Sequence, residues 1–75
     1  YSNAKYEDAL VEFEKAMDYD PTDVNPVYFT ARSYHRLGDN EKATLYYNLV
    51  LSDYPDSKRE KNAKEFLKQV SETNE

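Results

Sequence analysis

The sequence predicts an all-α fold of four helices, and three observations support this prediction. Apolar residues recur at steps of three and four through most of the 75 positions, which places them on one face of a helix. A single glycine and the lack of alternating β-branched runs argue against a sheet. Two proline-terminated segments also carry similar residues in the same order, which indicates an internal repeat within one small domain.

The first helix is expected from about Asn3 to Tyr19. Its apolar residues would form one buried face, and they are Tyr6, Ala9, Leu10, Phe13, Ala16 and Met17. Pro21 ends this helix, because a proline disfavours the helical conformation of the residue before it.

The second helix is expected over residues 24–37, between recognisable start and stop signals. Asp23 or Asn25 can cap its start, because a short polar side chain can accept a hydrogen bond from a free backbone N–H of the first turn. Pro26 is tolerated there, since the first turn does not need its missing N–H. Gly38 is the expected left-handed residue beyond the end of the helix.

The third helix is expected to start after Asp39, a plausible N-cap, and to run to about Asp53 before Pro55. Its buried face would consist of Ala43, Tyr46, Tyr47, Val50 and Leu51. These residues again follow steps of three and four, as expected for the buried face of a helix.

The fourth helix is expected to open with a capping box, in which Ser57 and Glu60 each accept a hydrogen bond from a free amide of the first turn. Its apolar stripe is Ala63, Phe66, Leu67 and Val70. The polar residues 71–75 that follow are expected to fray.

The composition excludes several functional classes. The formal net charge is −5, from 10 Lys and Arg against 15 Asp and Glu, so the overall field repels nucleic acids and anionic lipids. No apolar run approaches the roughly 20 residues of a membrane-spanning helix, and the first residues lack the pattern of a signal peptide. The absence of cysteine favours the cytoplasm without excluding a cell envelope.

The internal repeat has a period of 34 residues. Four matched pairs share this offset, and they are Ala9 with Ala43, Phe13 with Tyr47, Met17 with Leu51, and Pro21 with Pro55. A helical hairpin repeated every 34 residues resembles the tetratricopeptide repeat. The segment YEDALVEFEKAMDYDP is similar to the second helix of that repeat, and Ala31 and Tyr34 occupy first-helix positions where the family prefers a small residue and a tyrosine.

The resemblance implies antiparallel hairpins stacked as a right-handed α-solenoid. Residues 1–23 would be the second half of one repeat, residues 24–57 a complete repeat, and residues 58–75 a capping helix with a frayed tail. Ala31 and Ala43 would let the second and third helices approach closely. A plain four-helix bundle without repeat identity is the alternative that facing alanines would exclude.

The resemblance also implies a protein-interaction module, because first helices of such repeats line a concave surface that holds peptides. The exposed face of the second helix would then present Asn25, Tyr28, Phe29, Arg32, His35 and Arg36. Arginines beside aromatic rings suit a carboxylate of an acidic partner. In the alternative interpretation, Phe29 packs on a neighbouring helix and the arginines pair with carboxylates of this chain.

A second candidate surface is the N-terminal edge. Tyr6, Leu10, Phe13 and Met17 would be only half covered by the second helix, which predicts self-association of the chain through this edge.

We expect neither catalysis nor a metal or cofactor. His35 is the only histidine and stands without cysteine or a carboxylate pair in its own segment, and the sequence contains no glycine-rich phosphate loop. An alternative function is that of a regulatory or accessory segment of a larger multidomain enzyme or envelope protein. The stretch YPDS before the fourth helix is also similar to repeats of bacterial envelope lipoproteins.

Overall fold

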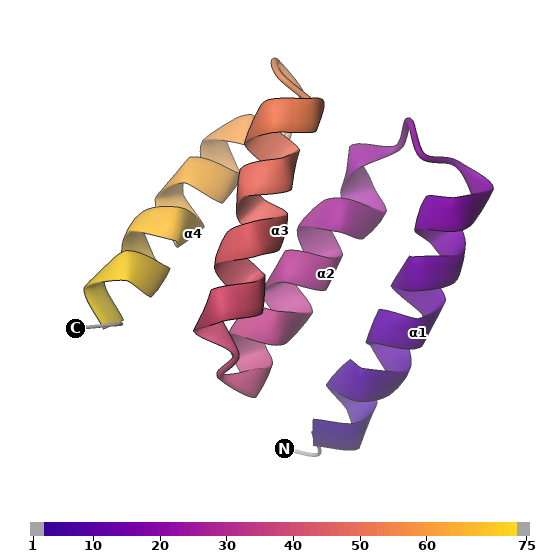
Figure 1. Cartoon of the computed structure of the whole chain (residues 1–75), viewed down its shortest axis with the longest axis horizontal. Coiled ribbons are helices and arrows are strands. Elements are labelled where there is room, and N and C mark those ends of the chain that lie inside the picture. Colours follow the sequence, from indigo (N-terminus) through magenta and orange to yellow (C-terminus); the bar gives the residue numbers. More distant parts are fainter. Residues whose placement is uncertain (1–2, 74–75) are drawn as a thin grey trace.

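The computed structural model describes residues 3–73, and all regular structure within this range is helical. The helices are α1 (Asn3–Tyr19), α2 (Val24–Leu37), α3 (Asn40–Asp53) and α4 (Glu60–Thr73). Figure 1 shows them side by side in chain order, with consecutive helices running in opposite directions. The predicted all-α fold of antiparallel hairpins is confirmed, and the expected bounds of the first three helices agree with those observed.

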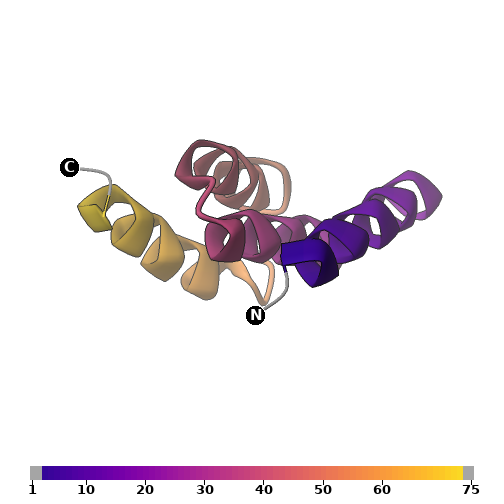
Figure 2. The same cartoon turned by 90° about the horizontal axis from the view of Figure 1, so that it is seen from below.

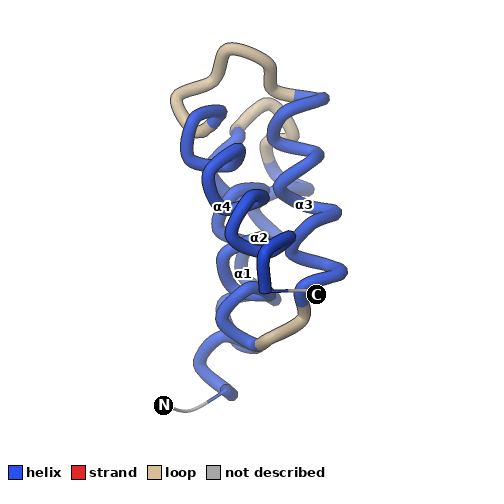
Figure 3. Tube along the Cα trace, turned by 90° about the vertical axis from the view of Figure 1, so that its left-hand side faces the viewer, coloured by secondary structure: helices blue, strands red, loops and turns tan. Residues whose placement is uncertain are grey.

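The four helices form two layers. Seen end on, α3 lies on one side of α2 and α4 (Figure 2), and a perpendicular view shows α3 apart from the other helices, which overlap in projection (Figure 3). Along its three principal axes the molecule extends over 33 × 28 × 15 Å. In this arrangement α3 covers the space between α2 and α4 and brings their apolar faces into one core.

The core lies where α2, α3 and α4 meet. Its buried apolar residues are Val24, Val27, Tyr28, Ala31, Ala43, Tyr47, Val50, Ala63 and Val70. Ala31, Ala43 and Ala63, one from each of these helices, have no exposed surface at all. Because a methyl group occupies so little space, the helix backbones can approach closely at these positions. The small residues noted in the sequence therefore belong to the packing surface.

The helix ends follow the predicted capping signals. A carboxylate oxygen of Asp23 accepts a hydrogen bond from the backbone N–H of Asn25 at 3.0 Å, which identifies Asp23 as the N-cap of α2. Gly38 follows α2 with a φ of 83°, a left-handed conformation that glycine adopts without steric cost. Asp39 caps α3 by accepting a hydrogen bond from the backbone N–H of Lys42 at 3.1 Å.

The start of α4 differs from the prediction. The expected capping box does not form: the Glu60 carboxylate accepts a hydrogen bond from the N–H of Asp56 at 3.3 Å, and the Ser57 hydroxyl is buried without a hydrogen-bond partner among the described residues. The physical reason is a longer connection. Six residues separate α3 from α4, whereas four separate α1 from α2, and Asp56 turns the longer loop with a positive φ of 64°.

The end of α4 also differs, because residues expected to fray remain helical up to Thr73, while residues 74–75 lie outside the described range. α4 has the same 14-residue length as α2 and begins 36 positions after it, two more than the repeat period of 34. Within residues 3–73, no helix has the length and apolar character needed to cross a membrane.

Two hydrogen bonds join the connections at one end of the molecule. The Tyr54 hydroxyl donates to the carbonyl of Pro21 at 2.6 Å, and the Nε of Arg59 donates to the side-chain carbonyl of Asn25 at 3.0 Å. In Figure 1 the α1–α2 and α3–α4 connections lie at the same end of the row of helices. The first bond joins the two connections, and the second holds the start of α4 against the start of α2.

Candidate functional site

The predicted site residues lie along α2, and the structure corrects one of them. Phe29 and Arg36 are exposed, whereas Tyr28 is buried with 3% of its surface accessible, contrary to the expectation that it lies on the open face. The Phe66 ring of α4 lies 6.3 Å from the Tyr28 ring, and the Arg59 guanidinium lies 4.8 Å above it. Tyr28 is therefore a core residue beneath the site.

Arg32 occupies the centre of this face. Its guanidinium carbon lies 4.3 Å from the centroid of the Phe66 ring, within the range of a cation–π interaction. Its Nε is buried and has no hydrogen-bond partner in the described part of the chain. A buried donor without a partner is costly, so an acceptor that reached Arg32 would gain a hydrogen bond to a charged group.

Among the described residues, no carboxylate forms an ion pair with Arg32 or Arg36. The ion pairs formed within residues 5–70 are Lys15 with Glu12 and Lys64 with Glu60, and neither includes Arg32 or Arg36. The interpretation in which both arginines pair with acids of this chain is therefore not what the structure shows for the described residues. Two cations remain on one face of a chain whose net charge is −5.

Phe29 contributes both to packing and to the surface. Its ring stacks on Phe13 of α1, with centroids 5.9 Å apart, and contacts the edge of Tyr28 at 5.3 Å. Even so, 36% of Phe29 is exposed. One part of the ring therefore holds α1 against α2, and the remainder is available for contact.

His35 lies between two aromatic rings at the α4 side of the face. Its ring meets Tyr47 at 6.2 Å and Phe66 at 5.9 Å, and its Nδ1 is 3.4 Å from the Tyr47 hydroxyl. Burial, and then the charges of Arg32 and Arg36, lower the pKa of His35. Burial raises the pKa of Tyr47. At neutral pH both groups are uncharged, so the positive charge of the face resides in the arginines.

Two hollows flank α2, and Arg32 and Arg36 border both. One, of about 380 Å³, lies between α1 and α2 and is lined by Lys5, Tyr6, Ala9, Phe13, Phe29, Arg32, Ser33 and Arg36. The other, of about 390 Å³, lies between α2 and α4 and is lined by Arg32, His35, Arg36, Phe66 and Gln69. The hollow between α1 and α2 has a mainly apolar lining, and the hollow between α2 and α4 has a mainly polar one. The guanidinium groups of Arg32 and Arg36 lie between the two hollows.

Comparison with protein families identifies the family of the chain. A family model described as tetratricopeptide repeat matches residues 1–65. The chain belongs to the tetratricopeptide repeat family. No curated protein and no solved structure matches it significantly. Tetratricopeptide repeats generally mediate protein–protein interactions and are typically non-catalytic scaffolds, so a protein partner is the kind of ligand this fold binds.

Within this tetratricopeptide fold, two residues of the site were missed by sequence reasoning. Arg59 places its guanidinium 4.9 Å from the Phe29 ring, and Phe66 lies under Arg32, although Phe66 was assigned only to the apolar stripe of the fourth helix. The sequence carried no signal for either residue, because the two additional residues before α4 shift this helix out of the 34-residue repeat register.

The predicted N-terminal edge is partly covered. Tyr6, Leu10, Phe13 and Met17 are all half-buried. Phe13 stacks on Phe29, and Met17 packs against the core. The more exposed apolar residues of α1 are Val11 and Tyr19, with 52% and 92% of their surface accessible.

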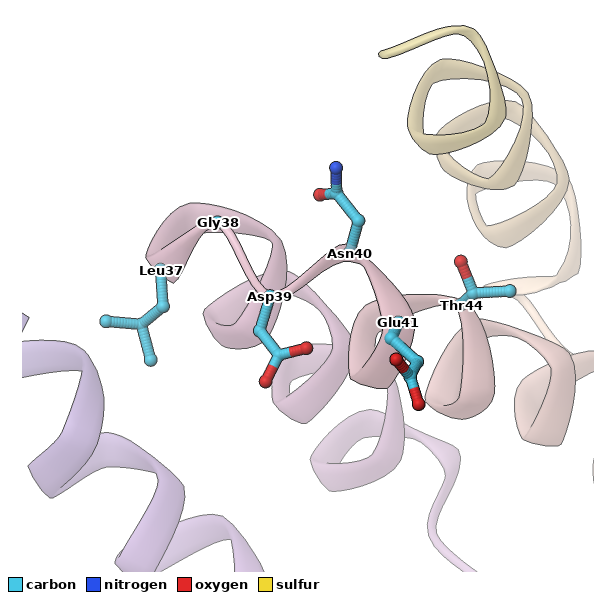
Figure 4. Close-up of a pocket in the computed structure, with 6 residues that line it drawn as sticks. All are labelled: Leu37, Gly38, Asp39, Asn40, Glu41 and Thr44. Atoms are coloured by element: carbon cyan, nitrogen blue, oxygen red, sulfur yellow. The ribbon is translucent and has the colours of Figure 1, made fainter. Parts of the chain in front are cut away.

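A larger hollow of about 680 Å³ lies at the α2–α3 turn, but it has no arrangement of binding groups. Figure 4 shows that the side chains lining this hollow point to different sides of the turn. The lining residues are Leu37, Gly38, Asp39, Asn40, Glu41 and Thr44. The Asp39 carboxylate is already used to cap α3. Within residues 5–70 no group of three potential metal ligands occurs, at this turn or elsewhere.

Proposed function

We propose that the chain is a non-catalytic interaction module that binds an acidic segment of a partner protein on the face of α2. The observation that supports this most directly is the pair Arg32 and Arg36, which have no carboxylate partner among the described residues although acids outnumber bases in the chain. A free pair of guanidinium groups in an acidic protein attracts a carboxylate locally, while the rest of the surface repels one.

Each residue of the face has a distinct role in this proposal. Arg32 and Arg36 donate paired hydrogen bonds to Asp or Glu side chains of the partner, a geometry that the planar guanidinium favours. Phe29 supplies exposed ring area at low entropic cost. Asn25, His35 and Arg59 border the face, and Tyr28 supports it from beneath.

The apolar hollow between α1 and α2 accepts one side chain of the partner. Its volume of about 380 Å³ and its lining by Phe13, Phe29 and Ala9 suit a leucine or an aromatic ring. Because Arg32 and Arg36 form its rim, the partner segment would carry an apolar residue close to its acidic residues.

The test is a fluorescence anisotropy titration with a labelled synthetic peptide in which Glu and Leu residues alternate. We expect binding by the wild-type chain and none by the Arg32→Glu, Arg36→Glu double variant, because two attractive contacts become repulsive. A peptide with Gln in place of every Glu should not bind the wild type. Circular dichroism checks that the variant remains folded.

Lys15→Glu with Lys42→Glu is the matched control. It changes the net charge by the same amount at exposed positions of α1 and α3 that border neither hollow. This control should reduce affinity far less than the arginine variant. Equal affinity of the wild type and the arginine variant would reject the α2 face as the binding site.

A further inference from the structure

The two ends of the row of helices have opposite charge patterns. α1 and α4 are the outermost helices in Figure 1, and each has a face that none of the other helices described within residues 3–73 covers. On α1, Glu7 and Glu14 are exposed and two helical turns apart. On α4, Lys61 and Lys68 are also exposed and have the same spacing. Residues seven apart lie on the same side of a helix, separated by about 10 Å.

These four charges have no ion-pair partner within the described residues. The ion pairs there are Lys15 with Glu12 and Lys64 with Glu60, both at the exposed surface. Glu7, Glu14, Lys61 and Lys68 are therefore available for contacts with another molecule. Acidic side chains at one end and basic side chains at the other are complementary to each other.

The directions of the helices favour one arrangement of two copies. Consecutive helices alternate in direction, and α1 runs opposite to α4 (Figure 1). A second copy placed beyond α4 therefore presents its α1 antiparallel to α4, which continues the alternation found within the chain. In this antiparallel register Glu7 of the second copy lies opposite Lys68, and Glu14 lies opposite Lys61.

Apolar contact can accompany these charge pairs. Val11 lies between Glu7 and Glu14 on α1, and 52% of its surface is exposed. Lys64 lies between Lys61 and Lys68, and its aliphatic stem can cover an apolar side chain while its ammonium remains in water.

We infer that copies of this chain associate head to tail, with the α1 face of Glu7, Val11 and Glu14 against the α4 face of Lys61, Lys64 and Lys68. The contact joins different surfaces of the two copies, so each dimer still has one free face of each kind and can grow further. This surface is separate from the α2 face proposed to bind an acidic peptide. The self-association predicted from the sequence used the half-buried stripe of α1, whereas the contact proposed here uses the exposed side of the same helix.

The test is sedimentation velocity over a concentration series up to the millimolar range. The weight-average mass of the wild type should rise with concentration and pass the dimer without a plateau. Glu7→Lys with Glu14→Lys should weaken the association by about tenfold or more, since two attractive pairs become repulsive. Lys61→Glu with Lys68→Glu should do the same.

Mixing the two charge-reversed variants gives the decisive result. Both contacts in the mixture again join opposite charges, so an equimolar mixture should regain the association that each variant alone has lost. Glu41→Lys with Asp53→Lys, at exposed positions of α3, is the matched control and should associate like the wild type. Thermal melts establish that every variant is folded.

Three outcomes would overturn the inference: a monomeric wild type at millimolar concentration, charge-reversed variants that associate as the wild type does, or a mixture that stays monomeric. Arg32→Glu with Arg36→Glu separates this contact from the peptide site and should leave the mass distribution unchanged. Loss of association in that variant would instead place the acidic α1 of one copy on the α2 face of another, and would also overturn the α1–α4 contact.

Discussion

The two sides of α2 differ in how tightly their side chains are packed. On the side facing α3, Val27 and Ala31 have 4% and 0% of their surface exposed, so a larger side chain does not fit there without moving a helix. On the other side, Phe29 and Arg36 are exposed, and Arg32 lies over a ring with its Nε unpartnered among the described residues. One 14-residue helix thus supplies part of the core and most of the candidate site.

The core side should therefore respond to changes of volume and the open side to changes of charge. The two responses should be separable, because substitutions on one side alter stability and substitutions on the other alter binding.

Tyr47→Ala should have the largest effect. Tyr47 of α3 is fully buried, and its ring stacks on Phe66 with centroids 5.7 Å apart and meets Tyr28 at 6.2 Å. Its removal leaves a cavity beneath both α2 and α4 and should lower the free energy of unfolding by about 3–5 kcal/mol. Urea unfolding followed by circular dichroism measures the change, and a loss below about 1 kcal/mol would show that the ring is not a core element.

Ala43→Leu should have the next largest effect. Ala43 has no exposed surface and lies in the same core as Ala31, so a larger side chain forces α2 and α3 apart. We expect a destabilisation of about 1–3 kcal/mol from overpacking. Thr44→Leu, at the adjacent half-buried position, is the comparison in the same thermal melts. Unchanged stability of Ala43→Leu would contradict close packing of the hairpin.

Tyr54→Phe should have a smaller effect. It removes the hydroxyl that donates to the Pro21 carbonyl at 2.6 Å and should cost about 1 kcal/mol. Tyr19→Phe is the control, since 92% of Tyr19 is exposed. Equal melting temperatures for the two variants would show that this bond does not hold the two connections together.

The pH dependence of stability through His35 should be the smallest effect. Burial and the neighbouring arginines lower the pKa of His35 in the folded chain below the ordinary value of 6.5. The unfolded chain then binds a proton more readily, so the contribution of His35 is complete above pH 6.5 and is lost as the pH falls through the folded pKa. His35→Gln should remove this part of the slope in melts across the pH range, and an identical slope would refute the assignment.

Much of the fold could be predicted because its determinants are local. The limits of α1, α2 and α3 follow from proline, glycine and aspartate signals that act within a few residues, as at Asp23, Gly38 and Asp39. The buried position of Ala43 followed from the repeat period and that of Ala31 from the family resemblance. A match to the tetratricopeptide family over residues 1–65 agrees with that period.

The remaining features depend on contacts that the repeat period does not contain. The two additional residues before α4 move its start to Glu60 and displace its side chains from the 34-residue register. As a result, Phe66 and Arg59 cover Tyr28, which the sequence had placed on the open face. The position of Ala31 on the core side of α2 followed from the family resemblance, whereas the open side depends on how α4 is displaced along α2.

The most direct test of the difference between the two sides is a nitrogen–proton correlation spectrum of the ¹⁵N-labelled chain, titrated with the Glu–Leu peptide. The amide signals of Phe29, Arg32 and Arg36, together with those around Phe66, should shift progressively and saturate, while those of Leu45 and Asn48 on the exposed side of α3 should not move. Shifts confined to α3, or a spectrum unchanged by saturating peptide, would contradict the assignment of the binding face to α2.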